Sequence, residues 1–195
     1  MKYSDRLKAM LAESAECKLK LLSDHTQMAL FQTAVEMVVE SYRSGGRLYI
    51  AGNGGSAADA QHLAAEFVCR LANDRPPLAA EALTTDTSTL TAIGNDYGFD
   101  DIFARQVEAK MKPGDVFLAI TTSGKSPNIL RALDACKHKG IKTIAFLGRD
   151  GGLAVDTADV AIIAKGYSTN VIQEQHITLA HALCACVEAA IFGNI

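Results

Sequence analysis

The sequence has no Cys-x-x-Cys pair and no excess of positive charge. Its five cysteines are scattered, and only Cys184 and Cys186 lie close together. This pattern argues against a disulfide framework or a zinc knuckle, and it fits buried thiols in a reducing cytoplasm. The formal net charge of -3 argues against a dedicated nucleic-acid-binding protein, because such proteins are usually basic.

The first residues also lack the apolar segment of a secretory signal. The longest apolar stretches look far shorter than a membrane span, so we expect no membrane association. The 195 residues are 49% hydrophobic and 21% charged, which is ordinary for a globular protein with a sizeable core. We therefore expect a cytoplasmic protein in which residues 1–195 form a single domain.

Residues from about Asp5 to Tyr42 predict two helices, because apolar side chains recur at helical spacing and Gly45-Gly46 follows as a stop signal. Residues 1–45 would then be a helical preface. Its apolar stripe needs a surface to pack on, either its own domain or a second subunit. Residues 46–195 would be the core.

Strand-like and helical segments alternate through this core. The expected strands cover residues 47–51, 79–83, 116–120, 143–147 and 160–163, and the expected helices cover residues 56–71, 89–110, 126–139 and 171–192. This alternation predicts an α/β fold, a three-layer sandwich with a central parallel sheet of about five strands, preceded by the two N-terminal helices.

Two loops rich in glycine and hydroxyl side chains each follow an expected strand and precede a helix. They are Gly52-Asn53-Gly54-Gly55-Ser56 and Thr121-Thr122-Ser123-Gly124-Lys125-Ser126. Such loops direct backbone N–H groups, hydroxyls and a helix N-terminus to one point, which suits a phosphate. For the second loop there is also a structural interpretation, in which Ser126 caps its helix and the threonines bond to the backbone.

Two stretches of the sequence match nucleotide-binding motifs only in part. Gly52-x-Gly54-x-x-Ala57 matches a loosened dinucleotide fingerprint, yet Glu81 lies inside the next strand rather than at its end. Nicotinamide binding is therefore a remote alternative. Gly124-Lys125-Ser126 resembles the end of a P-loop, but Ala119 stands where that motif needs glycine.

A histidine and a carboxylate share one helix face just after the first loop. His62 and Glu66 are four residues apart, which suits either a modest surface contact or a pair that binds a metal or moves a proton. The last helix carries Gln173 and His181 on one face, about 12 Å apart along the axis. Either both side chains bend inward to one ion, or another subunit supplies part of the site.

Several further stretches complete a family pattern that covers nearly the whole chain. They are Asp59-Ala60-Gln61-His62, Leu83-Thr84-Thr85-Asp86, Gly94-Asn95-Asp96-Tyr97-Gly98, Phe103-x-Arg105-Gln106-Val107, Ser126-Pro127-Asn128 and Ile172-Gln173-Glu174. With the two loops and Glu66, the chain resembles the phosphoheptose isomerases, which are sugar isomerase (SIS) domain proteins. The resemblance implies an SIS-type fold and conversion of sedoheptulose 7-phosphate to D-glycero-D-manno-heptose 7-phosphate. That reaction is the first step toward ADP- or GDP-heptose for lipopolysaccharide core or other surface glycans.

The resemblance also implies roles for particular residues. Sugar contacts would come from Asn53, Gly54, Gly55, Glu66, Asn95, Asp96 and Gln173, and phosphate contacts from Ser56, Thr121, Thr122, Ser123 and Ser126. One Zn²⁺ per subunit would be held by His62, Glu66, Gln173 and His181. The family is a homotetramer with its sites at subunit interfaces. Thr121 departs from the serine that the family more often has there, and it keeps the hydroxyl.

Ketose–aldose isomerisation through an enediol needs a base at carbon, an acid at oxygen and positive charge near the developing oxyanion. We expect Glu66 and His181 to be the catalytic pair, with Glu66 abstracting the carbon proton and His181 moving protons at the oxygens. Two alternatives remain. One is a non-catalytic phosphosugar-binding SIS regulator associated with the replication initiator, and the other is an isomerase for a different phosphosugar such as an amino sugar.

Overall fold

The computed structural model describes residues 2–71 and 74–193. Within them, five parallel strands form one sheet in the order β2-β1-β3-β4-β5. The strands are β1 (Leu48–Gly52), β2 (Ala80–Ala82), β3 (Val116–Thr121), β4 (Lys142–Gly148) and β5 (Val160–Ala164). The predicted α/β fold with a parallel sheet of about five strands is confirmed.

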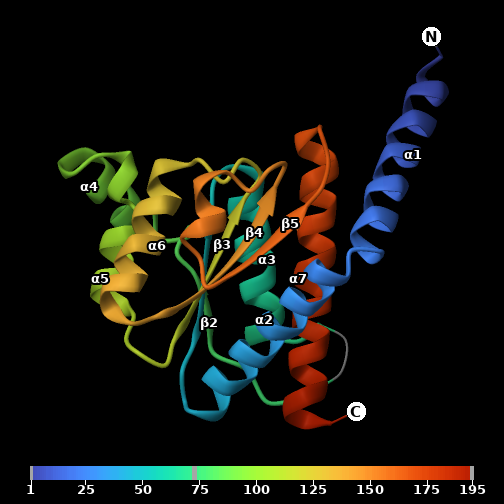
Figure 1. Ribbon diagram of the computed structural model, residues 1–195. Coiled ribbons are helices and arrows are strands. Elements are labelled where there is room, and N and C mark those ends of the chain that lie inside the picture. The colour runs from blue at the N-terminus through green and yellow to red at the C-terminus, as the bar shows by residue number, and fades with distance from the viewer. Residues whose placement is uncertain (1, 72–73, 194–195) are drawn as a thin grey trace.

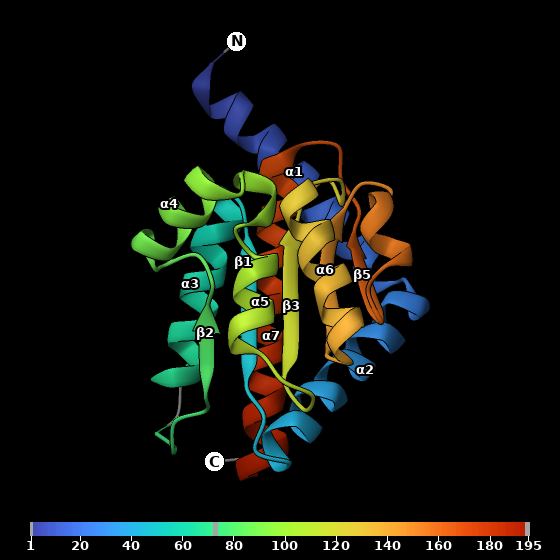
Figure 2. The same ribbon diagram turned by 90° about the vertical axis from the view of Figure 1, so that its left-hand side faces the viewer.

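Helices cover both faces of the sheet, as Figures 1 and 2 show. The helices are α1 (Tyr3–Leu22), α2 (His25–Arg43), α3 (Gly55–Val68), α4 (Thr87–Asp96), α5 (Ala104–Lys110), α6 (Pro127–Lys139) and α7 (Thr169–Phe192), with short 3-10 turns η1 (Phe99–Asp101) and η2 (Gly152–Asp156). Helices α2, α3 and α7 lie on one face, and α5 and α6 on the other. The expected two-helix preface is confirmed, and α1 extends away from the rest of the chain (Figure 1).

Both faces of the sheet are apolar, which explains the continuous apolar runs of its strands. Leu48 and Ile50 contribute to the core beneath α2, α3 and α7. Tyr49 and Ala51, which alternate with them, contribute to the second core beneath α5 and α6. The sheet is therefore the middle layer of the predicted three-layer sandwich.

The single helix expected over residues 89–110 is wrong. Helix α4 ends at Asp96, and Gly98 follows with a φ of +100° that residues other than glycine rarely adopt. The N–H groups of Tyr97 and Gly98 both donate to the carbonyl of Ile93, which closes the helix. The chain then turns through η1 before α5 begins at Ala104.

The expectation that no apolar stretch approaches a membrane span also needs correction. Helix α7 is long and apolar enough to qualify by length and composition, and 44% of its most apolar window is buried. Its buried side chains, among them Leu179, Leu183 and Val187, belong to the core shared with α2 and α3. This packing explains the apolar character of α7 as that of a core helix.

The two glycine- and hydroxyl-rich loops leave neighbouring strands. Gly52 at the end of β1 pairs with Ile120 of β3, so both loops begin at the carboxyl edge of the sheet. The chain continues from β1 into α3 on one face and from β3 into α6 on the other. Open α/β sheets bind ligands at the carboxyl edge between two neighbouring strands whose following helices lie on opposite faces of the sheet.

Candidate active site

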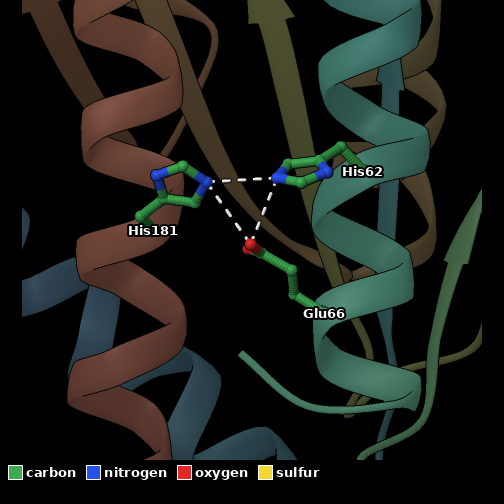
Figure 3. A group of neighbouring side chains, drawn as sticks. All are labelled: His62, Glu66 and His181. Carbon is green, nitrogen blue, oxygen red and sulfur yellow. Dashed lines mark hydrogen bonds and ion pairs between the residues drawn. The ribbon is translucent and has the colours of Figure 1, made fainter. Parts of the chain in front are cut away.

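Three side chains from two helices converge at one point (Figure 3). His62 and Glu66 lie four residues apart on one face of α3, and His181 reaches them from α7. The His62 Nε2 atom lies 3.1 Å from His181 Nε2 and 3.1 Å from Glu66 Oε1. The His181 Nε2 atom lies 3.3 Å from the same carboxylate oxygen. A single chain thus brings together three of the four expected metal ligands.

The burial of the cluster suits an ion that remains reachable from solvent. The Glu66 side chain is only 10% exposed, whereas those of His62 and His181 are 53% and 44% exposed. The second carboxylate oxygen of Glu66 is buried and has no hydrogen-bond partner within residues 2–71 and 74–193. A buried carboxylate oxygen without a partner is costly, so its environment favours a cation or a donor group from a ligand.

The donor set matches a zinc site with an open position. Ligand atoms about 2.0–2.2 Å from a tetrahedral ion lie about 3.3–3.6 Å from one another. The observed separations of 3.1–3.3 Å are close to that spacing. Two imidazole nitrogens and a carboxylate oxygen are ordinary zinc ligands, and catalytic zinc sites combine three protein ligands with a position left for water or substrate.

Gln173 lies next to the first loop, and its side chain makes no hydrogen bond to the residues that the structure describes. Its side-chain amide occupies the space next to Gly55, where a side chain on the glycine would collide with Gln173 Nε2. Gln173 is partly buried near the start of α7, and Gly55 is exposed at the start of α3. The first turns of the two helices therefore meet beside the loop, and only glycine at position 55 leaves the amide its place.

The first loop leaves the start of α3 uncapped by any side chain. Gly54 precedes the helix with φ +56° and ψ -120°, and no side chain bonds the first helical N–H groups. Ser56 is 3% exposed in the first turn. Asn53 exchanges two hydrogen bonds of 2.9 Å with Asn128, the buried side chain at the start of α6. This pair links the two loops, and a role for Asn128 was missed although it lies in the Ser126-Pro127-Asn128 stretch.

The hydroxyls of the second loop contact the backbone and one another. Thr121 is 5% exposed, and its hydroxyl accepts a hydrogen bond from the Gly124 N–H at 3.2 Å. Ser123 accepts one from the Lys125 N–H, also at 3.2 Å. Ser126 occupies the predicted N-cap position before Pro127, but its side chain makes no capping hydrogen bond. The Ser126 hydroxyl instead lies 3.5 Å from the Thr121 hydroxyl, and the partly buried Thr122 lies between these residues.

Asn95 and Asp96 are not brought to the loops by hydrogen bonds. They lie exposed at the end of α4, where the Asn95 amide donates to Asp96 at 2.7 Å. Among the residues that the structure describes, no hydrogen bond joins either of them to residues 52–56 or 121–126.

Two buried charged residues near the cluster were missed from the sequence. Arg75 and Glu188 form an ion pair of 2.6 Å, with the Arg75 side chain fully buried. A glutamate among the otherwise apolar residues 182–192 of α7 was the available signal. His176, in contrast, is a core residue. It is fully buried, its Nε2 atom lies 3.0 Å from the Leu147 carbonyl, and burial lowers its pKa to about 4.

Comparisons with known proteins agree with this architecture. The family model of the SIS domain matches residues 13–148. The chain is 49% identical to phosphoheptose isomerase 2 of Campylobacter jejuni over 96% of this chain and 94% of that protein. It is 46% identical to phosphoheptose isomerase of Aneurinibacillus thermoaerophilus over 98% and 96% of the two chains. The structure of phosphoheptose isomerase from Neisseria gonorrhoeae superposes with a TM-score of 0.90 at 41% identity, covering 96% of this chain and all of that one.

Proposed function

The chain belongs to the phosphoheptose isomerases within the SIS domain family, and from that premise we propose that it interconverts sedoheptulose 7-phosphate and D-glycero-D-manno-heptose 7-phosphate. The convergence of His62, Glu66 and His181 carries this assignment, since the reaction needs a base, an acid and a cation at one point. Two phosphate-suited loops at the adjacent edge of the sheet support it.

In the proposed mechanism Glu66 takes a proton from carbon 1 of the ketose and returns one to carbon 2. Its carboxylate is suited to this because it is nearly buried and one of its oxygens has no partner in the described chain. His181 gives and takes protons at the neighbouring oxygens, and its partly exposed ring faces the same point. Proton transfer by positioned groups of this kind contributes about 10²–10⁴-fold to turnover.

His62, Glu66, Gln173 and His181 are proposed to hold one Zn²⁺ per subunit. When bound, the ion would polarise the sugar oxygens and stabilise negative charge on the enediol. Gln173 is suited to link ion and sugar, because its amide lies at the start of α7 against Gly55 of the first loop.

The loops are proposed to bind the two ends of the substrate. Ser56, Thr121, Thr122, Ser123 and Ser126 would hold the phosphate, together with the uncapped starts of α3 and α6. Asn53, Gly54, Gly55, Asn95 and Asp96 would contact the sugar. Because α4 leaves Asn95 and Asp96 exposed, we propose that they act across a subunit interface, on the site of a neighbouring copy.

We propose a cytoplasmic homotetramer in which residues 1–195 of each copy form one SIS domain. Support comes from α1, which extends from the body with several exposed apolar side chains, namely Tyr3 (95% exposed), Leu7 (57%) and Leu11 (60%) (Figure 1). A helix with this surface would be covered by another subunit. The product would enter nucleotide-activated heptose synthesis for lipopolysaccharide core or another surface glycan.

The non-catalytic regulator is not favoured, because the most similar proteins described above are named as isomerases and the acid, base and cation-binding side chains are all present. The test is incubation of the protein with sedoheptulose 7-phosphate in D₂O, followed by NMR of the product. Proton transfer through an enediol predicts the aldose phosphate with deuterium at carbon 2. Product without deuterium, together with normal turnover of Glu66→Gln, would indicate hydride transfer and remove Glu66 as the base. Binding of the ketose without product would support the regulator.

A further inference from the structure

Arg75 is a buried cation whose hydrogen-bond donors are all used. Its Nε donates to Glu188 Oε1 at 2.8 Å, and its Nη2 lies 2.6 Å from the same oxygen. Nη2 also donates to the Glu66 carbonyl at 2.8 Å, and Nη1 donates to the carbonyls of Phe67 and Pro76 at 2.6 and 3.1 Å. Five N–H groups thus meet acceptors, so the guanidinium has one fixed orientation.

Two of the acceptors of Arg75 are carbonyls at the end of α3. Helix α3 finishes at Val68, and the carbonyls of a helix's last turn have no partner within the helix. Arg75 supplies partners for two of them, and its charge is favourable at the negative end of the helix dipole. Since one of the two carbonyls belongs to Glu66 itself, the backbone of the proposed base is bound directly by the guanidinium.

The counter-ion of Arg75 comes from α7. Glu188 is 8% exposed, and its Oε1 atom also accepts the Leu71 N–H at 3.4 Å and lies 3.7 Å from Cys184 Sγ. Glu188 follows His181 by seven residues, or two helical turns, so both side chains lie on the side of α7 that faces α3. Arg75 therefore connects the two helices whose side chains meet at the candidate metal site, through its ion pair with Glu188 of α7 and its hydrogen bonds to the α3 carbonyls.

We propose that Arg75 and Glu188 are positioning residues, which fix α3 against α7 so that His62, Glu66 and His181 converge on one cation. The proposed zinc site is the basis of this inference. The three ligand atoms lie 3.1–3.3 Å apart only while the helices keep this separation and rotation. Groups that orient metal ligands from outside the coordination shell change metal affinity by about 10–100-fold when they are removed.

The decisive variant replaces both partners, as Arg75→Met with Glu188→Leu. Removing one partner alone would leave a buried unpaired charge, whereas replacing both by apolar residues of similar size is often tolerated. We expect a folded protein whose affinity for Zn²⁺, measured by competition with a chromogenic chelator, is lower by about 10–100-fold. Co²⁺ should serve as a second probe, because its visible absorption reports the arrangement of the ligands.

Two further variants separate positioning from stability. Arg75→Lys keeps the charge and loses the planar fork, so it should weaken Zn²⁺ binding less than the double change does. It also keeps the test available if the double variant does not fold. Asp159→Asn is the control, because the Asp159 carboxylate accepts hydrogen bonds from Thr143 near the β5 edge of the sheet, and these bonds involve neither helix. It should lower the unfolding temperature and leave the affinity and the Co²⁺ spectrum unchanged.

Each outcome decides a different point. If the parent protein binds neither ion, the proposed metal site is wrong and the positioning role falls with it. If the parent binds, and the double variant or Arg75→Lys binds as tightly with the same Co²⁺ spectrum, the site stands and the positioning role is overturned. Affinity that falls equally in Asp159→Asn would also overturn it, because general loss of stability would then be the cause.

Discussion

His62 and His181 place their Nε2 atoms 3.1 Å apart although 119 residues separate them in the chain. Neither histidine is well buried, so no core packing requires this approach. Their rings meet edge to face with centroids 5.3 Å apart, and a carboxylate completes the group. Two ring nitrogens directed at each other and at a carboxylate form a site suited to a cation or a shared proton.

Glu66→Gln tests the proposed base. The amide has nearly the same shape but cannot accept the carbon proton, so turnover should fall by at least about 100-fold. The measurement is kcat with sedoheptulose 7-phosphate, with Glu36→Gln on the exposed side of α2 as the matched control. Near-normal turnover of Glu66→Gln would remove this residue from the proton transfer.

Ser126→Ala tests the proposed phosphate site. Loss of a bonded serine N-cap costs about 0.5–2 kcal/mol of stability. Ser126 makes no capping bond, and its contact with the Thr121 hydroxyl is long at 3.5 Å, so removing its hydroxyl should leave the free energy of unfolding nearly unchanged. The removed hydroxyl should instead weaken substrate binding and raise KM by about tenfold, as for a hydrogen bond of about 1.5 kcal/mol to a charged group. Lower stability with an unchanged KM would assign the residue to the helix instead.

Gly55→Ala tests the contact between the first loop and Gln173. The added methyl group would occupy the place of the Gln173 amide, which can swing aside because it ends a flexible side chain. Turnover should fall by about 10–100-fold if Gln173 must be held there. The unfolding temperature should change little. Ala58→Ser, on the exposed side of the same turn, is the control, and equal turnover in both variants would argue against a role for the contact.

His176 should make stability depend on pH. Burial lowers its pKa from 6.5 to about 4 in the folded chain, so between these values the unfolded chain binds the extra proton. The contribution of neutral His176 to the free energy of unfolding is complete above about pH 6.5. It is lost as the pH falls toward about 4, a total of about 3 kcal/mol. Urea unfolding of the parent and of His176→Gln should therefore give a stability difference that shrinks on acidification. A difference independent of pH would contradict the neutral, buried state.

Most of the fold was predictable because its signals are local. Apolar runs such as residues 116–120 mark strands buried on both faces, and Gly140, which ends α6 with a φ of +68°, was readable as a stop. The break at Gly98 was missed because the residues on both sides of this glycine continue a helical pattern. The apolar character of α7 was underestimated because its apolar residues are spaced along a helix rather than in one run.

The site was predictable only in part. The pair His62 and Glu66 follows from helix periodicity, but the approach of His181 depends on how α7 packs against α3, which no spacing shows. The two loops were recognised separately, and their adjacency depends on the pairing of β1 with β3. Arg75 and Glu188 were missed because, although Glu188 stands among apolar residues, no spacing in the sequence pairs it with Arg75.

The most direct test of the proposed function is turnover of sedoheptulose 7-phosphate by the purified protein, measured after chelator treatment and again after Zn²⁺ is restored. The proposal predicts formation of the aldoheptose phosphate with zinc, a loss of turnover of at least about 100-fold without it, and recovery on re-addition. Full turnover by the metal-free protein would contradict the role of the His62, Glu66 and His181 cluster as a metal site. Absence of product under both conditions would contradict the isomerase assignment itself.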